Sequence, residues 1–231
     1  KMVHWLHEQT GADNLAMAGG VALNCVMNAR LRDAGIFEQV WVQPAAGDAG
    51  TALGAALWVD AKERAGALKA SVRGTVLAPR RWRMRHAFLG PASSDEEIGA
   101  LLDWAQLPYQ RVDDPAEAAA ALLAANCVIG WHQGRMEFGP RALGARSILA
   151  SPIDPRMQAR INELKDREDF RPVAPAVPRE RLAEWFTPAQ ANRGDAAFML
   201  FVYDVRPEQA ERIPSACHSD GSARVQTVAA E

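Results

Sequence analysis

The chain has 231 residues, enough for one large domain or two modest ones. Hydrophobic residues make up 48% and charged residues 23% of it, as in ordinary globular proteins, and the formal net charge is −2. This charge argues against a general nucleic-acid binder, because such proteins are strongly basic. No apolar run of roughly 18 residues predicts a membrane span, and no secretory leader is recognisable.

Three cysteines, Cys25, Cys127 and Cys217, lie far apart in the sequence. Such an odd, dispersed set predicts neither a disulfide framework nor a C-x-x-C metal site, and it favours a reducing, cytoplasmic compartment. The sequence opens with Lys1 inside a helix-like segment and stops at Glu231 within a β-rich run. We therefore expect a fragment of a longer protein, cut at both ends.

Residues 1–65 alternate short strands and helices. Hydrophobic periodicity predicts helices over residues 2–9, 21–34 and 51–65 and strands over residues 15–18 and 37–43. This order predicts an α/β layer. His4 and His7 have a spacing that can share a metal ion, but no third ligand is nearby. The favoured interpretation is therefore a histidine pair on a helix surface.

Two strand-to-helix junctions in this part predict ligand contacts. Gly19 and Gly20 form a tight turn after the first strand, where a helix N-terminus can receive a phosphate. Asn24 follows in the first helical turn, and capping the helix is the simpler of its two interpretations, the other being a contact with a nucleotide. Asp48 lies between glycines after the second strand, which favours a metal or nucleotide role over a helix cap.

Residues 66–85 contain five arginines and show little apolar periodicity. They predict a linker between a first domain, residues 1–65, and a second domain, residues 86–231. The second domain has helix-start signals at residues 94–97 and 114–117 and is predicted to be α+β. Its other expected elements are strands at 109–112, 127–131, 148–150 and 198–203, helices at 116–125, 154–165 and 179–186, and a turn into a strand at 219–227.

Residues 134–150 form the most informative stretch of the chain. Three arginines, Arg135, Arg141 and Arg146, alternate there with Gly134, Gly139 and Gly144. Arginine offers a planar fork of donors that matches phosphate and carboxylate oxygens, and glycine lets the backbone approach a ligand. The stretch predicts an oxyanion-binding loop, and the alternative is a surface turn with solvated arginines.

A second basic segment follows the loop. The expected helix carries an apolar stripe at Met157, Ile161 and Leu164, which places Lys165 beside the stripe and toward a cleft. Arg171 follows in a segment that its prolines hold extended. Lys165 and Arg171 therefore become candidates for the same site as the loop.

The charge balance of this region points to an anionic ligand. From residue 135 to residue 171 the chain carries seven arginines and one lysine against six carboxylates. This excess predicts a site for one or two phosphorylated small molecules. No Walker or kinase glycine pattern is present, which argues against P-loop and kinase chemistry. No Ser-His-Asp or Cys-His set is recognisable, which disfavours a covalent acyl-enzyme.

Residues 134–150 and 162–175, with residues 19–24 and 47–54 upstream, closely resemble the ATP-dependent O-carbamoyltransferases. That family includes the nodulation-factor and antibiotic carbamoyltransferases. The motifs occur in the family's order, and the resemblance covers nearly the whole chain. It implies an α/β fold in which residues 1–65 are the C-terminal part of an actin/hexokinase-like ATPase domain. Residues 86–231 would be a threonylcarbamoyl-adenylate-synthase-like domain, truncated at its C-terminus.

The resemblance implies a two-step activity. The second domain would form carbamoyl-adenylate from carbamoyl phosphate and ATP, bound with Mg²⁺. The first domain would pass the carbamoyl group to a hydroxyl of a small-molecule acceptor near a divalent metal, Fe²⁺ in relatives. The identity of the acceptor and the oligomeric state are not indicated by the sequence.

The resemblance also assigns roles to residues. It places Arg141, Lys165 and Arg171 as the catalytic groups that hold carbamoyl phosphate and the phosphates of ATP, and Asp48 as a metal ligand. The implied nucleotide contacts are Gly19, Gly20, Asn24, Arg146 and Arg224. The family's two metal-binding histidines, in an H-x-x-x-H motif, do not occur in this sequence, so we expect an incomplete metal site.

Two other functions stay open. One is a tRNA threonylcarbamoyl-type modification enzyme, which the net charge and the order of the motifs disfavour. The other is a non-catalytic module that binds nucleotides or anions, which truncation makes more credible for the fragment alone.

Overall fold

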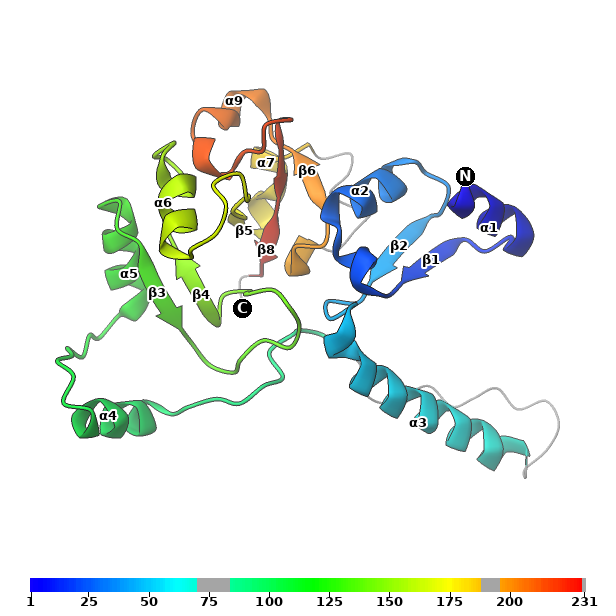
Figure 1. The fold of residues 1–231 in the computed structure, drawn as a ribbon, viewed down its shortest axis with the longest axis horizontal. Helices are drawn as coiled ribbons and strands as arrows, with labels where there is room; N and C mark the ends of the chain where they lie inside the picture. Colours follow the sequence, from blue (N-terminus) through cyan, green and yellow to red (C-terminus); the bar gives the residue numbers. More distant parts are fainter. Residues whose placement is uncertain (70–83, 188–195, 230–231) are drawn as a thin grey trace.

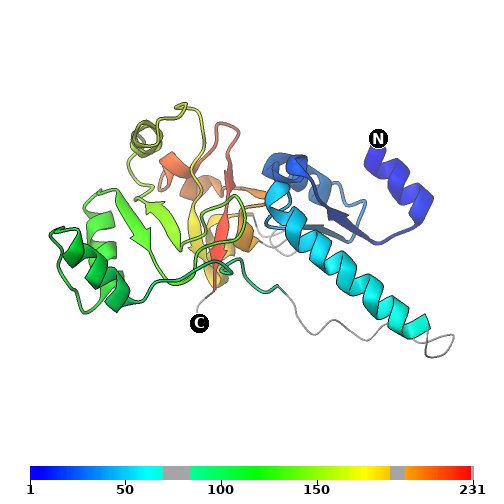
Figure 2. The same cartoon turned by 60° about the horizontal axis from the view of Figure 1, so that its bottom comes forward.

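The computed structural model describes residues 1–69, 84–187 and 196–229. Figures 1 and 2 show a central body from which two helices project on opposite sides, α3 (Thr51–Lys69) and α4 (Asp95–Trp104). The body consists of short helices and small sheets, so the fold is mixed α/β. In the part of the chain that the structure describes, no helix is long and apolar enough to cross a membrane.

The N-terminal part is a small parallel β–α unit. Strands β1 (Asn14–Met17) and β2 (Gln39–Val42) pair in parallel, with Asn14 opposite Gln39 and Met17 opposite Val42. Around them lie α1 (Met2–Thr10), the 3-10 turn η1 (Gly20–Leu23), α2 (Cys25–Asp33) and the 3-10 turn η2 (Asp48–Gly50). The predicted alternation of strand and helix is confirmed, although α2 begins four residues later than expected. The later start occurs because Asn24 has an extended backbone and serves as the N-cap.

The C-terminal part contains three further two-stranded sheets. Strands β3 (Ile129–His132) and β4 (Arg146–Leu149) are antiparallel, as are β6 (Val202–Asp204) and β7 (Ser222–Arg224). Strands β5 (Ala176–Pro178) and β8 (Gln226–Val228) are parallel. The remaining elements are α5 (Pro115–Ala124), α6 (Met157–Leu164), η3 (Arg179–Arg181), α7 (Leu182–Trp185), η4 (Ala196–Phe198), α9 (Pro207–Ala210) and η5 (Pro214–Ala216).

Local helix-start signals were read correctly. The Ser94 hydroxyl accepts the backbone N–H of Glu97 while the Glu97 carboxylate accepts that of Ser94, so the capping box before α4 is confirmed. Asp114 caps α5 through the N–H of Glu117, and Pro115 occupies the first helical position. Both signals depend on neighbours within one helical turn.

Several predicted strands and helices differ from the structure. Residues 109–112 form no strand, because this exposed segment has no neighbouring strand among the described residues. The strand predicted at 198–203 shortens to β6, since Met199 has a φ of 56° that interrupts the extended chain. The helix predicted at 179–186 is a 3-10 turn followed by the single turn of α7. Strands β3 and β4 are only partly buried, and Ile148 is 40% exposed.

Helix α3 ends at Lys69, beyond the predicted end at residue 65. The first residues of the expected linker at 66–85 are therefore helical, and most of the rest of it lies outside the described residues. The boundaries of the two expected domains stay predictions.

One hydrophobic core joins the two parts of the chain. Phe37, Val40 and Val42 from the N-terminal part belong to the same buried cluster as Leu200 and Phe201. Two polar side chains of α2 complete the junction. The Asn28 amide donates to the Leu200 carbonyl at 3.0 Å, and the Arg32 guanidinium donates to the Val202 carbonyl at 3.1 Å. The body is thus continuous across the expected domain boundary.

Candidate functional site

The loops that follow β1 and β2 lie side by side at the carboxyl edge of the parallel pair. The Gly19 N–H donates to the Ala46 carbonyl at 2.7 Å, and Gly19 has a φ of 96° that favours glycine. A Cβ built on Gly47 would lie 3.8 Å from the Gly20 Cα, so the two backbones nearly touch. A Cβ built on Gly19 or on Gly20 would meet no other heavy atom within 4 Å. The edge is therefore open to a ligand, where α/β sheets commonly bind one.

Two candidates from the sequence stand at this edge. The Asn24 Oδ1 accepts the N–H groups of Val26 at 3.1 Å and Met27 at 3.0 Å, which confirms the capping interpretation and leaves a nucleotide contact untested. Asp48 is exposed, and its carboxylate receives no hydrogen bond within the described residues. It therefore does not cap a helix there, and it is free to meet a ligand.

The structure assembles no complete metal centre. Within residues 1–69, 84–187 and 196–229, no group of three or more His, Cys, Asp or Glu side chains could hold an ion. Asp48 is thus a single oxygen donor. His7 contacts the Ala12 carbonyl and packs edge-on against Phe37 at 5.2 Å, which supports a structural role for it.

The loop at residues 134–146 has a defined shape. Gly134, Gly139 and Gly144 all have positive φ, at 54°, 115° and 108°. Gly139 also lies against the N-terminal part, where a Cβ would come within 3.1 Å of the Pro44 carbonyl oxygen. The prediction that glycines shape this loop is confirmed for the backbone.

Glu137, which the sequence analysis did not single out, holds the loop together. Its Oε1 accepts the backbone N–H groups of Leu143 at 2.8 Å, Ala145 at 2.8 Å and Arg146 at 3.1 Å. Burial pushes the pKa of Glu137 upward, but these N–H groups together outweigh it and hold the pKa below its ordinary value. The Gln226 amide adds a buried hydrogen bond to the Leu143 carbonyl at 2.7 Å. The loop is therefore preorganised.

Two arginines of the loop bind its own framework. Arg146 donates to the carbonyl groups of Gln133, Gly134 and Ala145 at 3.0–3.3 Å. Arg135 donates to the Leu89 carbonyl at 3.1 Å. Both guanidinium groups therefore stabilise the backbone around the loop. The nucleotide contact expected of Arg146 stays a prediction.

Arg141 and Arg224 differ from these two. Arg141 donates through Nη2 to the Leu23 carbonyl at 3.1 Å, which brings the loop to the start of α2. The Nε atoms of Arg141 and Arg224 are buried and have no hydrogen-bond partner among the described residues. Burial lowers the pKa of Arg224, and the positive charge of Arg141 lowers it further. The hydrogen bond from Gln226 to the Leu143 carbonyl joins the two segments that carry these arginines. An anion between them would relieve both costs.

The cluster extends to the segment after α6. Burial lowers the pKa of Arg167, the charge of Arg171 lowers it further, and the Glu168 carboxylate, which Arg171 contacts, opposes this shift. Asn162, which is fully buried, positions both arginines. Its amide donates to the carbonyl groups of Asp169 at 2.8 Å and Arg171 at 2.9 Å, and its oxygen accepts from Arg167. Arg167 was missed by the sequence analysis, because only the fold turns it toward the cluster.

The prediction for Lys165 rested on a wrong stripe. Leu164 is 63% exposed, and Asn162 takes the buried position of the helix after Ile161. Lys165 itself is exposed beyond the end of α6, and no hydrogen bond or ion pair holds its amine within the described residues. Arg171 is also exposed at the surface, where its Nε donates to the Glu168 carboxylate. The grouping of Arg141, Lys165, Arg171 and Arg224 in one site therefore stays a prediction.

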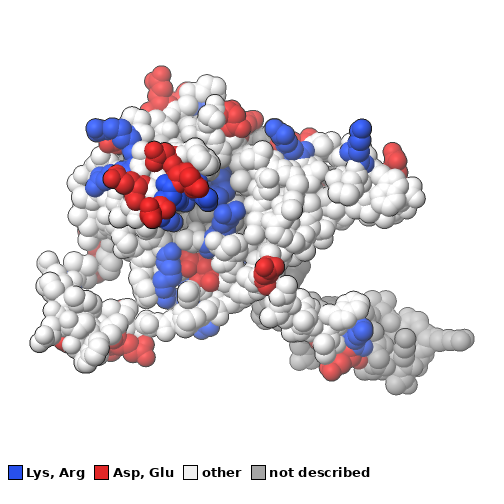
Figure 3. Space-filling model, in the orientation of Figure 1, with Lys and Arg blue, Asp and Glu red and all other residues white. Residues whose placement is uncertain are grey.

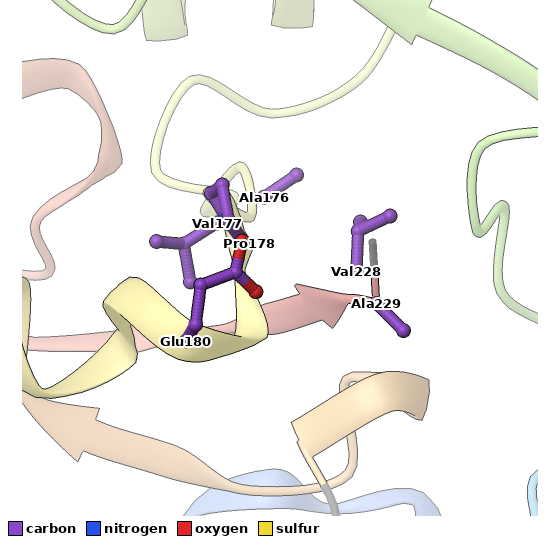
Figure 4. Close-up of a pocket in the computed structure, with 6 residues that line it drawn as sticks. All are labelled: Ala176, Val177, Pro178, Glu180, Val228 and Ala229. Atoms are coloured by element: carbon purple, nitrogen blue, oxygen red, sulfur yellow. The ribbon is translucent and has the colours of Figure 1, made fainter. Parts of the chain in front are cut away.

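Figure 3 shows several Lys and Arg side chains meeting near the centre of one face, beside a group of Asp and Glu side chains. A separate groove of about 290 Å³ lies at the β5–β8 pair, where Val228 and Ala229 stand across from Ala176 and Pro178 (Figure 4). Among the described residues that line it, Glu180 is the one with a charge, so an anion is not expected there. The arginine cluster is the better candidate for an anionic ligand.

Comparisons with known proteins identify the family of the chain. A family model described as the carbamoyltransferase N-terminus matches residues 1–57, and one described as the carbamoyltransferase C-terminus matches residues 120–231. Nodulation protein NolNO of Sinorhizobium fredii is 44% identical over 96% of this chain and 31% of its own length. Nodulation protein NolO of Bradyrhizobium diazoefficiens is 44% identical over 95% and 38%. Nodulation protein U of Rhizobium fredii is 36% identical over 96% and 34%.

The chain spans about a third of the length of these relatives. The two matched regions contain the glycine loops with Asp48 on one side and the arginine cluster on the other. By sequence and by the arrangement of its motifs, the chain belongs to the carbamoyltransferase family.

Proposed function

We propose that this chain belongs to an O-carbamoyltransferase and that its arginine cluster binds carbamoyl phosphate. The observation that carries the proposal is the pair of buried Nε atoms on Arg141 and Arg224, which have no partner within the described residues. Two adjacent cations with free donors fit a ligand with at least two negative charges. Arg167, which Asn162 holds in place, and Arg171 would add positive charge for the phosphates of a second anion, ATP.

The proposed first reaction forms carbamoyl-adenylate. Water cleaves carbamoyl phosphate to carbamate and phosphate, and a carbamate oxygen then attacks the α-phosphorus of ATP. The bond between the α- and β-phosphates breaks, and pyrophosphate leaves. Both substrates are anions, so the arginines act by reducing their mutual repulsion and by fixing their orientation. Mg²⁺ bound to ATP would neutralise further charge.

The second reaction is assigned to the edge formed by the loops after β1 and β2. Gly19 and Gly20 leave open space in front of the backbone, which suits an adenylate phosphate. Asp48 fits as one oxygen ligand of a divalent ion such as Fe²⁺. The resemblance places the histidine ligands in an H-x-x-x-H motif that this sequence lacks. When bound, such an ion would act as a Lewis acid on the carbamoyl group while a hydroxyl of the acceptor attacks.

We also propose that the family's fold has two domains. The N-terminal part is proposed to belong to an actin/hexokinase-like domain, and the C-terminal part to a threonylcarbamoyl-adenylate-synthase-like domain. The acceptor is proposed to be a small hydroxyl-bearing molecule, and a cytoplasmic location follows from the cysteine usage. A tRNA threonylcarbamoyl-type activity is the second candidate in the same chemical class, because both folds occur there.

The test separates the two reactions in the intact protein. Pyrophosphate release that requires carbamoyl phosphate reports the first reaction, and mass spectrometry of candidate acceptors for one added carbamoyl group reports the second. Asp48→Ala should abolish transfer but spare pyrophosphate release. Equal loss of both would count against a role confined to the second reaction. Tight, salt-sensitive tRNA binding would favour the second candidate instead.

A further inference from the structure

His218 lies in a turn that the backbone defines closely. The His218 N–H donates to the Ser222 carbonyl at 2.7 Å, and the Gly221 N–H donates to the His218 carbonyl at 3.0 Å. Gly221 has a φ of 80°, which permits this tight reversal. The turn places the imidazole over β7, where its Nδ1 lies 3.0 Å from the Ser222 hydroxyl.

The hydrogen bonds of Ser222 determine the tautomer of this imidazole. The Ser222 hydroxyl has one proton, and it donates that proton to the Asp220 carboxylate at 2.7 Å. Ser222 therefore accepts from His218, so Nδ1 carries the imidazole proton. Burial lowers the pKa of His218, Asp220 partly opposes this shift, and the charge of Arg224 lowers the pKa further. The ring is neutral at pH 7, and its Nε2 carries no proton, so that Nε2 can only accept a hydrogen bond.

The Nε2 atom of His218 lies inside the protein, where no described residue donates a hydrogen bond to it. Bulk water does not reach it, so a bound group must satisfy it or its burial costs free energy. Ser222 and Arg224 are two residues apart on one strand and project to the same face. His218 therefore shares that face with Arg224, and Gln226, two residues after Arg224, bonds the Leu143 carbonyl in the loop that carries Arg141.

We propose that His218 is a specificity-determining residue that accepts a hydrogen bond from the amino group of carbamoyl phosphate. This inference rests on the proposed function, and it adds a recognition element for the carbamoyl end of the ligand. Arg141 and Arg224 require an oxyanion, and His218 requires an N–H or O–H donor beside it. Carbamoyl phosphate carries both. Acetyl phosphate has the same phosphate and carbonyl groups but a methyl group in place of the amine, so it cannot donate.

The test measures the preference between these two ligands in the intact protein. Calorimetric titrations with carbamoyl phosphate, acetyl phosphate and inorganic phosphate give three dissociation constants for each variant. The wild type should bind carbamoyl phosphate at least about tenfold more tightly than acetyl phosphate, as expected for one hydrogen bond to a buried acceptor. His218→Phe, which keeps a ring but removes the acceptor, should bring the two constants within about threefold while binding of inorganic phosphate is retained.

Two further variants control the result. His132→Phe makes the same chemical change at an exposed histidine of β3 and should keep the wild-type preference. Ser222→Ala no longer fixes the proton on Nδ1, so it should reduce the preference even where His218→Phe fails to fold. An unchanged preference in both His218→Phe and Ser222→Ala would overturn the inference, and a change in melting temperature alone would indicate a structural water at Nε2. A wild type that binds none of the three ligands would overturn the proposed function as well.

Discussion

Arg141 and Arg224 each have a buried Nε without a partner among the described residues, and the charge of Arg141 lowers the pKa of Arg224 beyond the effect of burial. Proteins rarely bury cations in this way unless an opposite charge joins them. The pair is held by rigid neighbours, since Arg141 follows Pro140 and contacts the Leu23 carbonyl, and Arg224 lies on β7. The ligand-free protein thus carries an electrostatic cost that an anion would remove.

Removing one cation should therefore stabilise the free protein. Arg224→Met keeps most of the buried volume and abolishes the repulsion and the unpartnered donor, which together are worth about 1 kcal/mol or more. We expect the melting temperature without ligand to rise by about 2–4 °C. The wild type should gain about 2.7 kcal/mol at a carbamoyl phosphate concentration near a hundred times its dissociation constant, and the variant should gain almost nothing. A lower melting temperature in the free variant would show that Arg224 supports the fold instead.

Glu137 should control the stability of the loop in a pH-dependent way. Because its folded pKa lies below its ordinary value of 4.5, its contribution is present above that pH and is lost as the pH falls through the folded pKa. Glu137→Ala frees three backbone N–H groups and should cost about 2 kcal/mol at pH 7. Glu137→Gln, which keeps an acceptor, should cost less. Urea unfolding at pH 7 and pH 3.5 checks this, and a difference that does not shrink in acid would contradict it.

Asn162 should affect ligand binding without touching the ligand. Asn162→Ala removes one of the two donors to the Asp169 and Arg171 carbonyl groups and leaves Arg167 without its acceptor, and we expect a loss of about 1–2 kcal/mol in stability. Arg167 and Arg171 then lose their orientation, so carbamoyl phosphate should bind several-fold more weakly even at a temperature where the variant is fully folded. Gln158→Ala is a suitable control, because the half-buried Gln158 bonds the same two carbonyl groups but makes no hydrogen bond to Arg167 among the described residues. Normal binding in Asn162→Ala would remove Asn162 from the positioning role.

Asn28 should couple the two parts of the chain. Its fully buried amide bonds the carbonyl groups of Ala22 at 2.7 Å and Leu200 at 3.0 Å, one from each part. Asn28→Ala should cost about 2 kcal/mol and lower a single unfolding transition seen by both circular dichroism and tryptophan fluorescence. Two separate transitions in the wild type would instead support the independent domains that the sequence suggested.

The successes of the sequence analysis concern local chemistry. The Ser94 capping box, the Asp114–Pro115 helix start and the Asn24 cap depend on atoms within a few residues, so a short stretch of sequence specifies them. The positive φ of Gly139 was likewise anticipated from its place in the loop. The roles that the family resemblance implies for Arg141 and Arg224 stay predictions.

The failures concern contacts between distant residues. Glu137, Arg167 and His218 have ordinary neighbours in the sequence, and their partners come from other turns and strands. Lys165 was placed by a helical stripe that stops at Ile161, because Asn162 is buried for its hydrogen bonds and not for its hydrophobicity. Periodicity weighs apolar residues, so it cannot detect a buried amide of this kind.

The most direct test of the shared anion site is a double-mutant cycle on Arg141 and Arg224. Titrations with carbamoyl phosphate would be made for the wild type, Arg141→Met, Arg224→Met and the double variant, with thermal melting to confirm folding. If both arginines clamp one anion, each single variant should lose at least about tenfold in affinity, and the double variant should lose clearly less than the product of the two losses. Wild-type affinity in both single variants, or losses that multiply fully, would contradict a single site between Arg141 and Arg224.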